Sequence, residues 1–222
     1  NMVIAKGSSG WNGVDNARFL EISLRGGNAS NVFNNPKPGD KIIGLRSRGF
    51  RSNGFALVRH VLQKKFGANW HTKKFDSKKT WGEAVLQPSI IYSGALLELL
   101  GRFGQKRVSN IKALAHITGG GIPGNITRVL GKYGASLDNV WAPHETMLQL
   151  QEMGNVTDKE AYEVWNMGTG MMVVSNEFKK IEATMKKHGI QAQIVGEVIK
   201  EPVVRLVSQA YFNKGKLLQF TT

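Results

Sequence analysis

One stretch decides the fold of this chain: His116-Ile117-Thr118-Gly119-Gly120-Gly121-Ile122-Pro123-Gly124-Asn125. The apolar residues from Ile111 to Ala115 predict a short strand before it, and a helical pattern resumes from about Asn125. Bare glycines between a strand and a helix let main-chain N–H groups face outward, beside the positive end of the helix dipole. Such a place binds anions, usually phosphate. A tight turn that needs positive φ explains the same glycines, and local spacing does not separate the two interpretations.

Two further loops present small residues next to regular structure. Ser52-Asn53-Gly54 opens a helix, and residues 166–170 lead into an apolar strand. Main-chain N–H groups in such loops suit the recognition of anions or amides. Three asparagines could each bind a polar ligand or brace their own turn: Asn53, Asn125 and Asn166.

His116 precedes Thr118 and the glycines, so it could lie at the mouth of the same pocket. A structural histidine with satisfied hydrogen bonds is the alternative, and the more common one. His60 stands alone on a helical pattern and is expected to face water or the flank of the helix.

The composition bounds the class of protein. With 222 residues, 41% of them hydrophobic, the chain can bury the core of one large domain or of one domain with an attached piece. Cysteine is absent, which excludes disulfides, thiolate metal sites and a cysteine nucleophile. No apolar run approaches the roughly 18 residues that cross a bilayer. We therefore expect no membrane association and a cytoplasmic location.

The net charge of +14 invites nucleic acid as a partner. The lysines are dispersed in pairs, however, and no aromatic-rich, base-stacking signature accompanies them. A basic surface that binds phosphorylated small molecules, or a merely solvated face, explains the charge equally well. The pairs are Lys64-Lys65, Lys73-Lys74, Lys78-Lys79, Lys179-Lys180 and Lys186-Lys187.

Strands alternate with helices along the chain. Pattern and turn residues predict helices over 55–66, with Ser52 or Asn53 as N-cap, and over 90–100, 144–154 and 175–189. They predict strands over 2–5, 19–24, 41–45, 135–140, 171–174, 193–199, 203–207 and 216–220. We expect an α/β (α+β) fold, a mixed sheet with helices on one face, and a domain boundary in the loop of residues 28–40.

Several common chemistries find no support. The five histidines lack the spacing of a zinc site, and the glycine turn is not followed by the Lys-Ser or Lys-Thr of a Walker A loop. No G-x-S-x-G elbow and no carboxylate pair stand out. The sequence therefore predicts no metal site and names no catalytic residue.

Five motifs, in order and with similar spacing over roughly residues 40–200, resemble the phosphoribosylformylglycinamidine cyclo-ligases, or AIR synthetases, of purine biosynthesis. Any one would be weak, but five in order are specific. They are Gly49–Arg59; His116–Gly121 with Asn125-Ile126 and Arg128–Leu130; Trp141-Ala142-Pro143; Leu148–Val156; and Asn166–Met171.

The resemblance implies an ATP-dependent ring closure that converts formylglycinamidine ribonucleotide into aminoimidazole ribonucleotide. ATP and Mg2+ are the implied cofactors, with ligands mostly outside this chain, and a phosphorylated small molecule is the implied substrate. The complete enzyme would be a homodimer. Residues implied to bind the substrate and its phosphate are Ser52, Asn53, Gly54, His116, Thr118, Gly119, Gly120, Gly121 and Asn125.

The same resemblance divides the chain into residues 1–38, a remnant of the N-terminal ATP-binding domain with its linker, and residues 39–222, the C-terminal domain. A missing N-terminal domain or subunit would then be a partner. Asp15, in a segment similar to the family's Asp-x-Ala-Gly-Phe, and Asn166 are implied to contact ATP.

Three departures put metal-assisted use of ATP by this chain in question. Residues 6–10 lack the carboxylates of the family's Gly-Glu-Thr-Ala-Glu run, Arg51 replaces a histidine, and Gly124 replaces a glutamate. An alternative function is therefore a non-catalytic basic module, derived from this family, that binds nucleic acid or an assembly partner.

Overall fold

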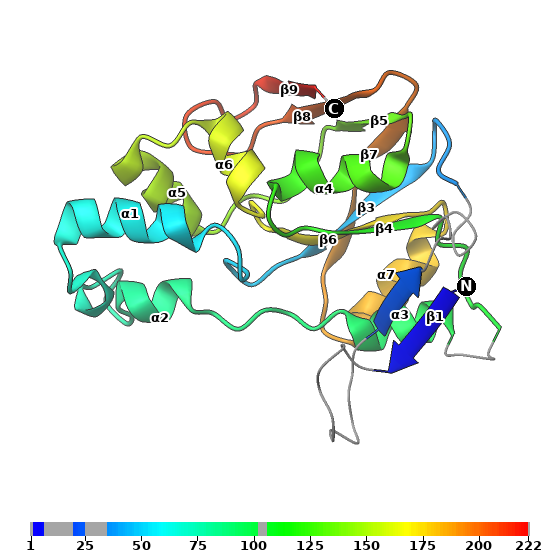
Figure 1. Ribbon diagram of the computed structural model, residues 1–222, viewed down its shortest axis with the longest axis horizontal. Coiled ribbons are helices and arrows are strands. Elements are labelled where there is room, and N and C mark those ends of the chain that lie inside the picture. Colours follow the sequence, from blue (N-terminus) through cyan, green and yellow to red (C-terminus); the bar gives the residue numbers. More distant parts are fainter. Residues whose placement is uncertain (1, 7–19, 25–34, 102–105, 222) are drawn as a thin grey trace.

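The computed structural model describes residues 2–6, 20–24, 35–101 and 106–221. Seven strands form the main sheet: β3 (Lys41–Arg46), β4 (Ala113–His116), β5 (Gly134–Leu137), β6 (Thr169–Val174), β7 (Ala192–Ile199), β8 (Val203–Val207) and β9 (Leu217–Thr221). Their order is β4-β6-β3-β7-β5-β8-β9, and every neighbouring pair is antiparallel except β5 with β8 (Figure 1). The predicted mixed sheet is confirmed.

Two more strands, β1 (Met2–Lys6) and β2 (Leu20–Leu24), pair with each other as an antiparallel sheet of their own. Both lie where the sequence predicts strands. The division of the chain at residue 38 remains a prediction.

Helices cover both faces of the main sheet rather than one. On one face, α3 (Ser93–Leu100) and α7 (Phe178–Lys187) pack over Ile43, Leu45 and Val173. On the other, Ile42, Met172 and Val174 lie beneath α1 (Phe55–Phe66), α4 (Gly121–Leu130), α5 (Glu145–Gly154) and α6 (Asp158–Val164). The reason is that β3 and β6 are apolar at successive positions, so neither face can be left to water.

Two helix starts differ from the expected ones. α1 is capped by Gly54 at φ 75°, not by Ser52 or Asn53, and α4 begins at Gly121 rather than near Asn125. Pro123 falls in the first turn of α4, where its missing N–H costs no hydrogen bond. The glycine turn is therefore itself the helix start.

The polar segment 67–80, in which no periodicity is predicted, contains a short 3-10 helix, η2 (Trp70–Thr72), and leads into α2 (Trp81–Val85). Thr80 and Glu83 form a reciprocal capping box there, a signal that is present in the sequence. Trp81 is buried against Phe75, with ring centroids 4.9 Å apart, and ties the segment to the core. No helix within the described ranges is long and apolar enough to cross a bilayer.

Candidate functional site

The two bends expected to form the site pack against one shared element, the C-terminal end of α6. A Cβ atom added to Gly121 would lie 1.8 Å from the carbonyl oxygen of Tyr162. A Cβ atom added to Gly54 would lie 2.5 Å from Cδ1 of Trp165, and the Asn53 Nδ2 donates to the carbonyl of Val164 at 3.0 Å. The structure therefore brings the Ser-Asn-Gly bend (residues 52–54) and the glycine bend (residues 118–121) together.

Asn125 holds the glycine bend open. Its side chain is 4% exposed, and its Nδ2 donates to the carbonyl oxygens of Thr118, Gly119 and Gly121 at 3.3, 3.2 and 2.7 Å. Those carbonyls are thereby turned inward, while the exposed N–H groups of Gly119 and Gly120 donate to no group within the described residues. Asn125 thus braces its turn, and two free N–H groups face water at the positive end of α4.

The three glycines of this bend differ in backbone conformation and in the space around them. Gly120 and Gly121 have φ of 92° and 57°, whereas Gly119 has no positive φ and open space where a side chain would begin. The bend is both a positive-φ turn and a helix N-terminus with exposed donors. The two interpretations left open by the sequence are compatible.

Arg128 adds a cation that the sequence-based expectation missed. It is exposed, its Nη1 lies 3.3 Å from Oδ1 of Asn125, and its Nη2 lies 3.8 Å from the position of a Cβ on Gly120. The signal was its position three residues after Asn125, which places both side chains on one face of a helix. Gly124, one turn before Arg128, has no side chain and so offers no carboxylate to neutralise the guanidinium. A Cβ atom added at Gly124 would meet open space.

His116 is bonded to Arg51, the residue that replaces the family's histidine. The Arg51 Nη2 donates to Nε2 of His116. Because a guanidinium can only donate, Nε2 carries no proton, and the neutral ring holds its proton on Nδ1. Desolvation of the ring and the charge of Arg51 both lower the pKa of His116, which favours this neutral form.

The loop of residues 166–170 buries the side chain of its asparagine. Asn166 is 1% exposed, and its Oδ1 accepts from Oγ of Ser47 and the N–H of Gly168, both at 2.9 Å. Its Nδ2 donates to the carbonyl of Gly49 at 2.9 Å. The buried amide therefore braces its own loop against the segment that follows β3, and the implied contact of Asn166 with ATP stays a prediction. Asp15, the other residue expected to contact ATP, lies outside the described residues.

The remaining expected residues differ in exposure. Ser52 is exposed, and its hydroxyl makes no hydrogen bond to a described residue. The Oγ1 of Thr118 reaches Oδ1 of Asn125 at 3.5 Å. The Oδ1 of Asn53 is buried and has no hydrogen-bond partner among the described residues. Ser52 and the glycine bend can therefore receive a ligand directly, whereas Gly54 is required for packing against Trp165.

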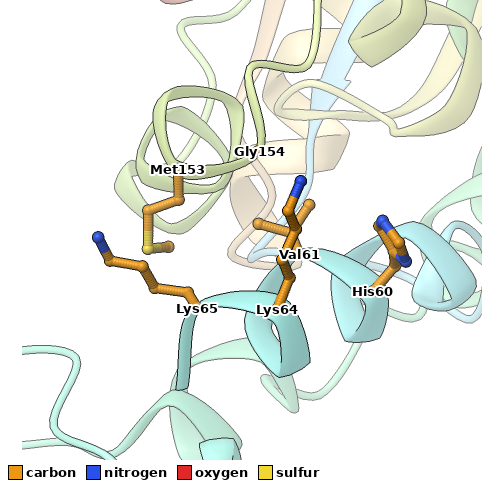
Figure 2. Close-up of a pocket in the computed structure, with 6 residues that line it drawn as sticks. All are labelled: His60, Val61, Lys64, Lys65, Met153 and Gly154. Atoms are coloured by element: carbon orange, nitrogen blue, oxygen red, sulfur yellow. The ribbon is translucent and has the colours of Figure 1, made fainter. Parts of the chain in front are cut away.

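A separate hollow of about 210 Å³ lies between α1 and α5 (Figure 2). It is lined by His60, Val61, Lys64, Lys65, Met153 and Gly154. All three basic side chains come from α1, and His60 faces water as predicted. His60, Lys64 and Lys65 are all exposed, so the hollow is a basic patch of surface.

The described residues do not fit a magnesium ion. Within the described ranges no three His, Asp or Glu side chains come together as metal ligands, and both cations of the site, Arg51 and Arg128, disfavour another cation. The described residues therefore supply no assembled set of ligands for a magnesium ion.

Comparison with known proteins agrees with this geometry. A family model described as "AIR synthase related protein, C-terminal domain" matches residues 37–209. The phosphoribosylformylglycinamidine cyclo-ligase of Sorangium cellulosum is 40% identical over 166 residues, which make up 72% of this chain and 46% of that enzyme. The trifunctional purine biosynthetic protein adenosine-3 of Drosophila melanogaster is 42% identical over 172 residues, 75% of this chain and 12% of that protein.

This chain spans about half the length of the curated cyclo-ligases it matches. Among solved structures, a chain of the HypE-HypF complex aligns with a TM-score of 0.52 at 20% identity, covering 83% of this chain and 53% of that chain. That likeness shows the fold. Sequence motifs, family match and fold agree, and the chain belongs to the AIR synthase related proteins through their C-terminal domain.

Proposed function

We propose that this chain is the C-terminal part of a phosphoribosylformylglycinamidine cyclo-ligase and holds the phosphate end of the nucleotide substrate. The observation that carries the proposal is the pair of free N–H groups on Gly119 and Gly120, which Asn125 braces and Arg128 flanks. Outward N–H groups at a helix N-terminus, with an arginine beside them, match a phosphate monoester in charge and in hydrogen bonding. The relatives are named phosphoribosylformylglycinamidine cyclo-ligases, and the proposed reaction is the ring closure that this name describes.

In that reaction ATP phosphorylates the amide oxygen of formylglycinamidine ribonucleotide, and an internal nitrogen then attacks the same carbon and displaces phosphate. The glycine bend would fix the ribose phosphate, so that the reacting end is held at a constant place. His116, neutral with its proton on Nδ1, can donate a hydrogen bond toward the ligand without adding a positive charge. Ser52, on the facing bend, can donate one from its hydroxyl.

Most residues for ATP and Mg2+ belong, in this proposal, to a part of the enzyme outside this chain. Asp15 and Asn166 are the two candidates for ATP in this sequence, and Asp15 lies within residues 1–38, which we propose to be the end of an N-terminal domain. The complete enzyme would supply the rest of that domain, as one polypeptide or as a second subunit. A cytoplasmic homodimer is the corresponding expectation for the whole protein.

Calorimetry with ribose 5-phosphate and with formylglycinamidine ribonucleotide tests the phosphate site. Gly119→Asp should weaken the binding of both by at least about tenfold, because the new carboxylate repels the phosphate. Gly119 is the position to change, since it has open space and no positive φ, so the fold is not strained. Gly119→Ala is the matched control, and it should keep most of the affinity because the N–H is unchanged.

Equal affinity in wild type and Gly119→Asp would contradict the proposed site. RNA binding that falls steeply with salt, without any affinity for the phosphate esters, would instead favour the basic-module alternative. The exposed lysine pairs of residues 64–79 would then be the first positions to neutralise.

A further inference from the structure

Arg51 carries a partly buried positive charge that no carboxylate neutralises within the described residues. Its guanidinium carbon lies 5.5 Å from the ring centroid of Tyr92, and its Nη2 bonds to His116. Its Nε is buried and donates to no group within the described residues, whereas the guanidinium also interacts with the Tyr92 hydroxyl. A buried guanidinium N–H without an acceptor is unfavourable as it stands, because that donor has left water and gained no partner in exchange.

The surrounding residues are arranged to keep this guanidinium at the site. A Cβ atom on Gly170 would lie 1.9 Å from Oη of Tyr92 and 3.1 Å from Nη1 of Arg51, so the glycine makes room for both groups. The Tyr92 hydroxyl donates to the carbonyl of Arg46 at 2.7 Å, which fixes the ring that carries the guanidinium. Three elements, the end of β3, the start of α3 and β6, thus converge on Arg51.

Arg51 is also close to the phosphate site without being part of it. It bonds to His116, and Gly119 follows three residues later, so the chain between them spans at most about 11 Å. A nucleotide with groups at both ends can bridge that distance. Arg128, the cation beside the glycine bend, belongs to α4 and is bonded to Asn125 instead.

We propose that Arg51 is a second oxyanion anchor, so that this part of the surface binds a ligand with two anionic groups, one at the glycine bend and one at Arg51. This inference rests on the proposed function and specifies its ligand class. In the proposed reaction the phosphorylated amide carries a second phosphoryl group besides the ribose phosphate. Rotation of the guanidinium off Tyr92 toward that group satisfies Nε and Nη1 with charge-assisted hydrogen bonds.

The choice of arginine over histidine has a physical consequence. A guanidinium stays charged throughout the physiological pH range and offers two parallel donors to an oxyanion. A histidine at the same place would titrate near neutrality. The second anchor of this chain is therefore permanently charged.

The test uses inorganic phosphate as the probe, titrated with and without saturating ribose 5-phosphate. We expect phosphate to bind in both cases, and Arg51→Gln to weaken the binding that persists beside ribose 5-phosphate by at least about tenfold. Arg51→Lys should recover only part of this phosphate affinity, because an ammonium lacks the two parallel N–H donors of a guanidinium. The matched control is Arg205→Gln, which removes the same charge on β8, four strand spacings or about 19 Å from β6.

A readout of the guanidinium itself separates binding from a structural role. In ¹⁵N-labelled protein, phosphate should shift the Nε–H resonance of Arg51 in wild type and in Arg205→Gln. Phosphate affinity that is unchanged in Arg51→Gln, or an Nε–H resonance that phosphate does not move, would overturn the second anchor and leave the proposed function intact. Loss of ribose 5-phosphate binding in Gly119→Asp tests the proposed function separately, with Arg51 unchanged.

Discussion

Gly121 lies directly against the main chain of Tyr162, with only 1.8 Å between the position of its missing Cβ and the Tyr162 carbonyl oxygen. This contact joins the start of α4 to α6. It therefore places the glycine bend next to the element that also supports Gly54. The site depends on a close approach of two backbones that any side chain would prevent.

Gly121→Ala should destabilise the protein by more than about 3 kcal/mol or prevent folding, because the new Cβ meets backbone atoms and φ is 57°. Urea unfolding followed by circular dichroism measures the effect. Gly119→Ala, in the same bend, should change the free energy of unfolding by no more than about 0.5 kcal/mol. Similar losses in both variants would show that the contact with Tyr162 is not the reason for Gly121.

Gly170 and Tyr92 should behave as a coupled pair. Gly170→Ala is expected to destabilise strongly, since its Cβ would lie 1.9 Å from the tyrosine oxygen. Tyr92→Phe alone should cost about 1 kcal/mol, through the lost hydrogen bond to the carbonyl of Arg46. In the double variant the penalty of Gly170→Ala should be smaller, because the nearest atom is gone. Strict additivity in the double-mutant cycle would refute the clash.

The lowered pKa of the Asp40 carboxyl predicts how the free energy of unfolding depends on pH. Burial of this carboxyl raises its pKa, but hydrogen bonds from Lys112, the N–H of Lys37 and Asn176 outweigh that effect, and the pKa is lowered overall. A carboxyl with a lowered folded-state pKa stabilises the fold above its unfolded pKa of about 4. That contribution should be lost as the pH falls through the folded-state pKa.

Lys112→Met should therefore lower the free energy of unfolding at pH 7 by about 2 kcal/mol and leave a smaller difference near pH 2, where Asp40 is protonated. Lys41→Met is the control, since its ion pair with Glu197 is about half exposed and should contribute less than about 1 kcal/mol. A loss for Lys112→Met that is the same at both pH values would contradict the role given to Asp40.

Asp158 anchors the segment that follows β8. Its carboxylate is 1% exposed and accepts from Oγ of Ser208 at 2.7 Å, Nε2 of Gln151 at 3.1 Å, and the N–H groups of Phe212 and Asn213 at 3.0 and 2.9 Å. Asp158→Asn replaces one acceptor oxygen with a donor, so at least one buried donor loses its partner. We expect a loss of about 2–4 kcal/mol and faster hydrogen exchange at residues 208–213. Unchanged exchange there would show that other contacts hold the segment.

Local patterns were sufficient for much of the fold. Helix α1 spans Phe55–Phe66 as predicted, because its apolar residues recur at helical spacing, and the strands at 41–45 and 203–207 are found within a residue or two. Helices α2 and α6 were missed, although both begin with a Thr-x-x-Glu pattern. They are short, and periodicity over five or seven residues carries little weight against a polar segment.

The site could be predicted in part. The glycine bend and its Asn125 follow from residue types alone, whereas the bracing of Asn166 depends on Ser47 and Gly49, more than a hundred residues away in the sequence. The caps were misassigned for the same reason. Gly54 was chosen over Ser52 and Asn53 by the indole of Trp165, which lies beneath it.

The amino-acid sequence by itself determined most of the helices and strands, where bare glycines expose donors, and the family to which the motifs belong. These properties depend on neighbours a few residues apart, and chain geometry makes them local. Tertiary structure alone decided that two bends pack against the end of α6, that helices cover both faces of the sheet, and that Arg51 stands against Tyr92 with its Nε unpaired among the described residues. Close packing decides such contacts, because only the folded chain brings distant residues within van der Waals distance.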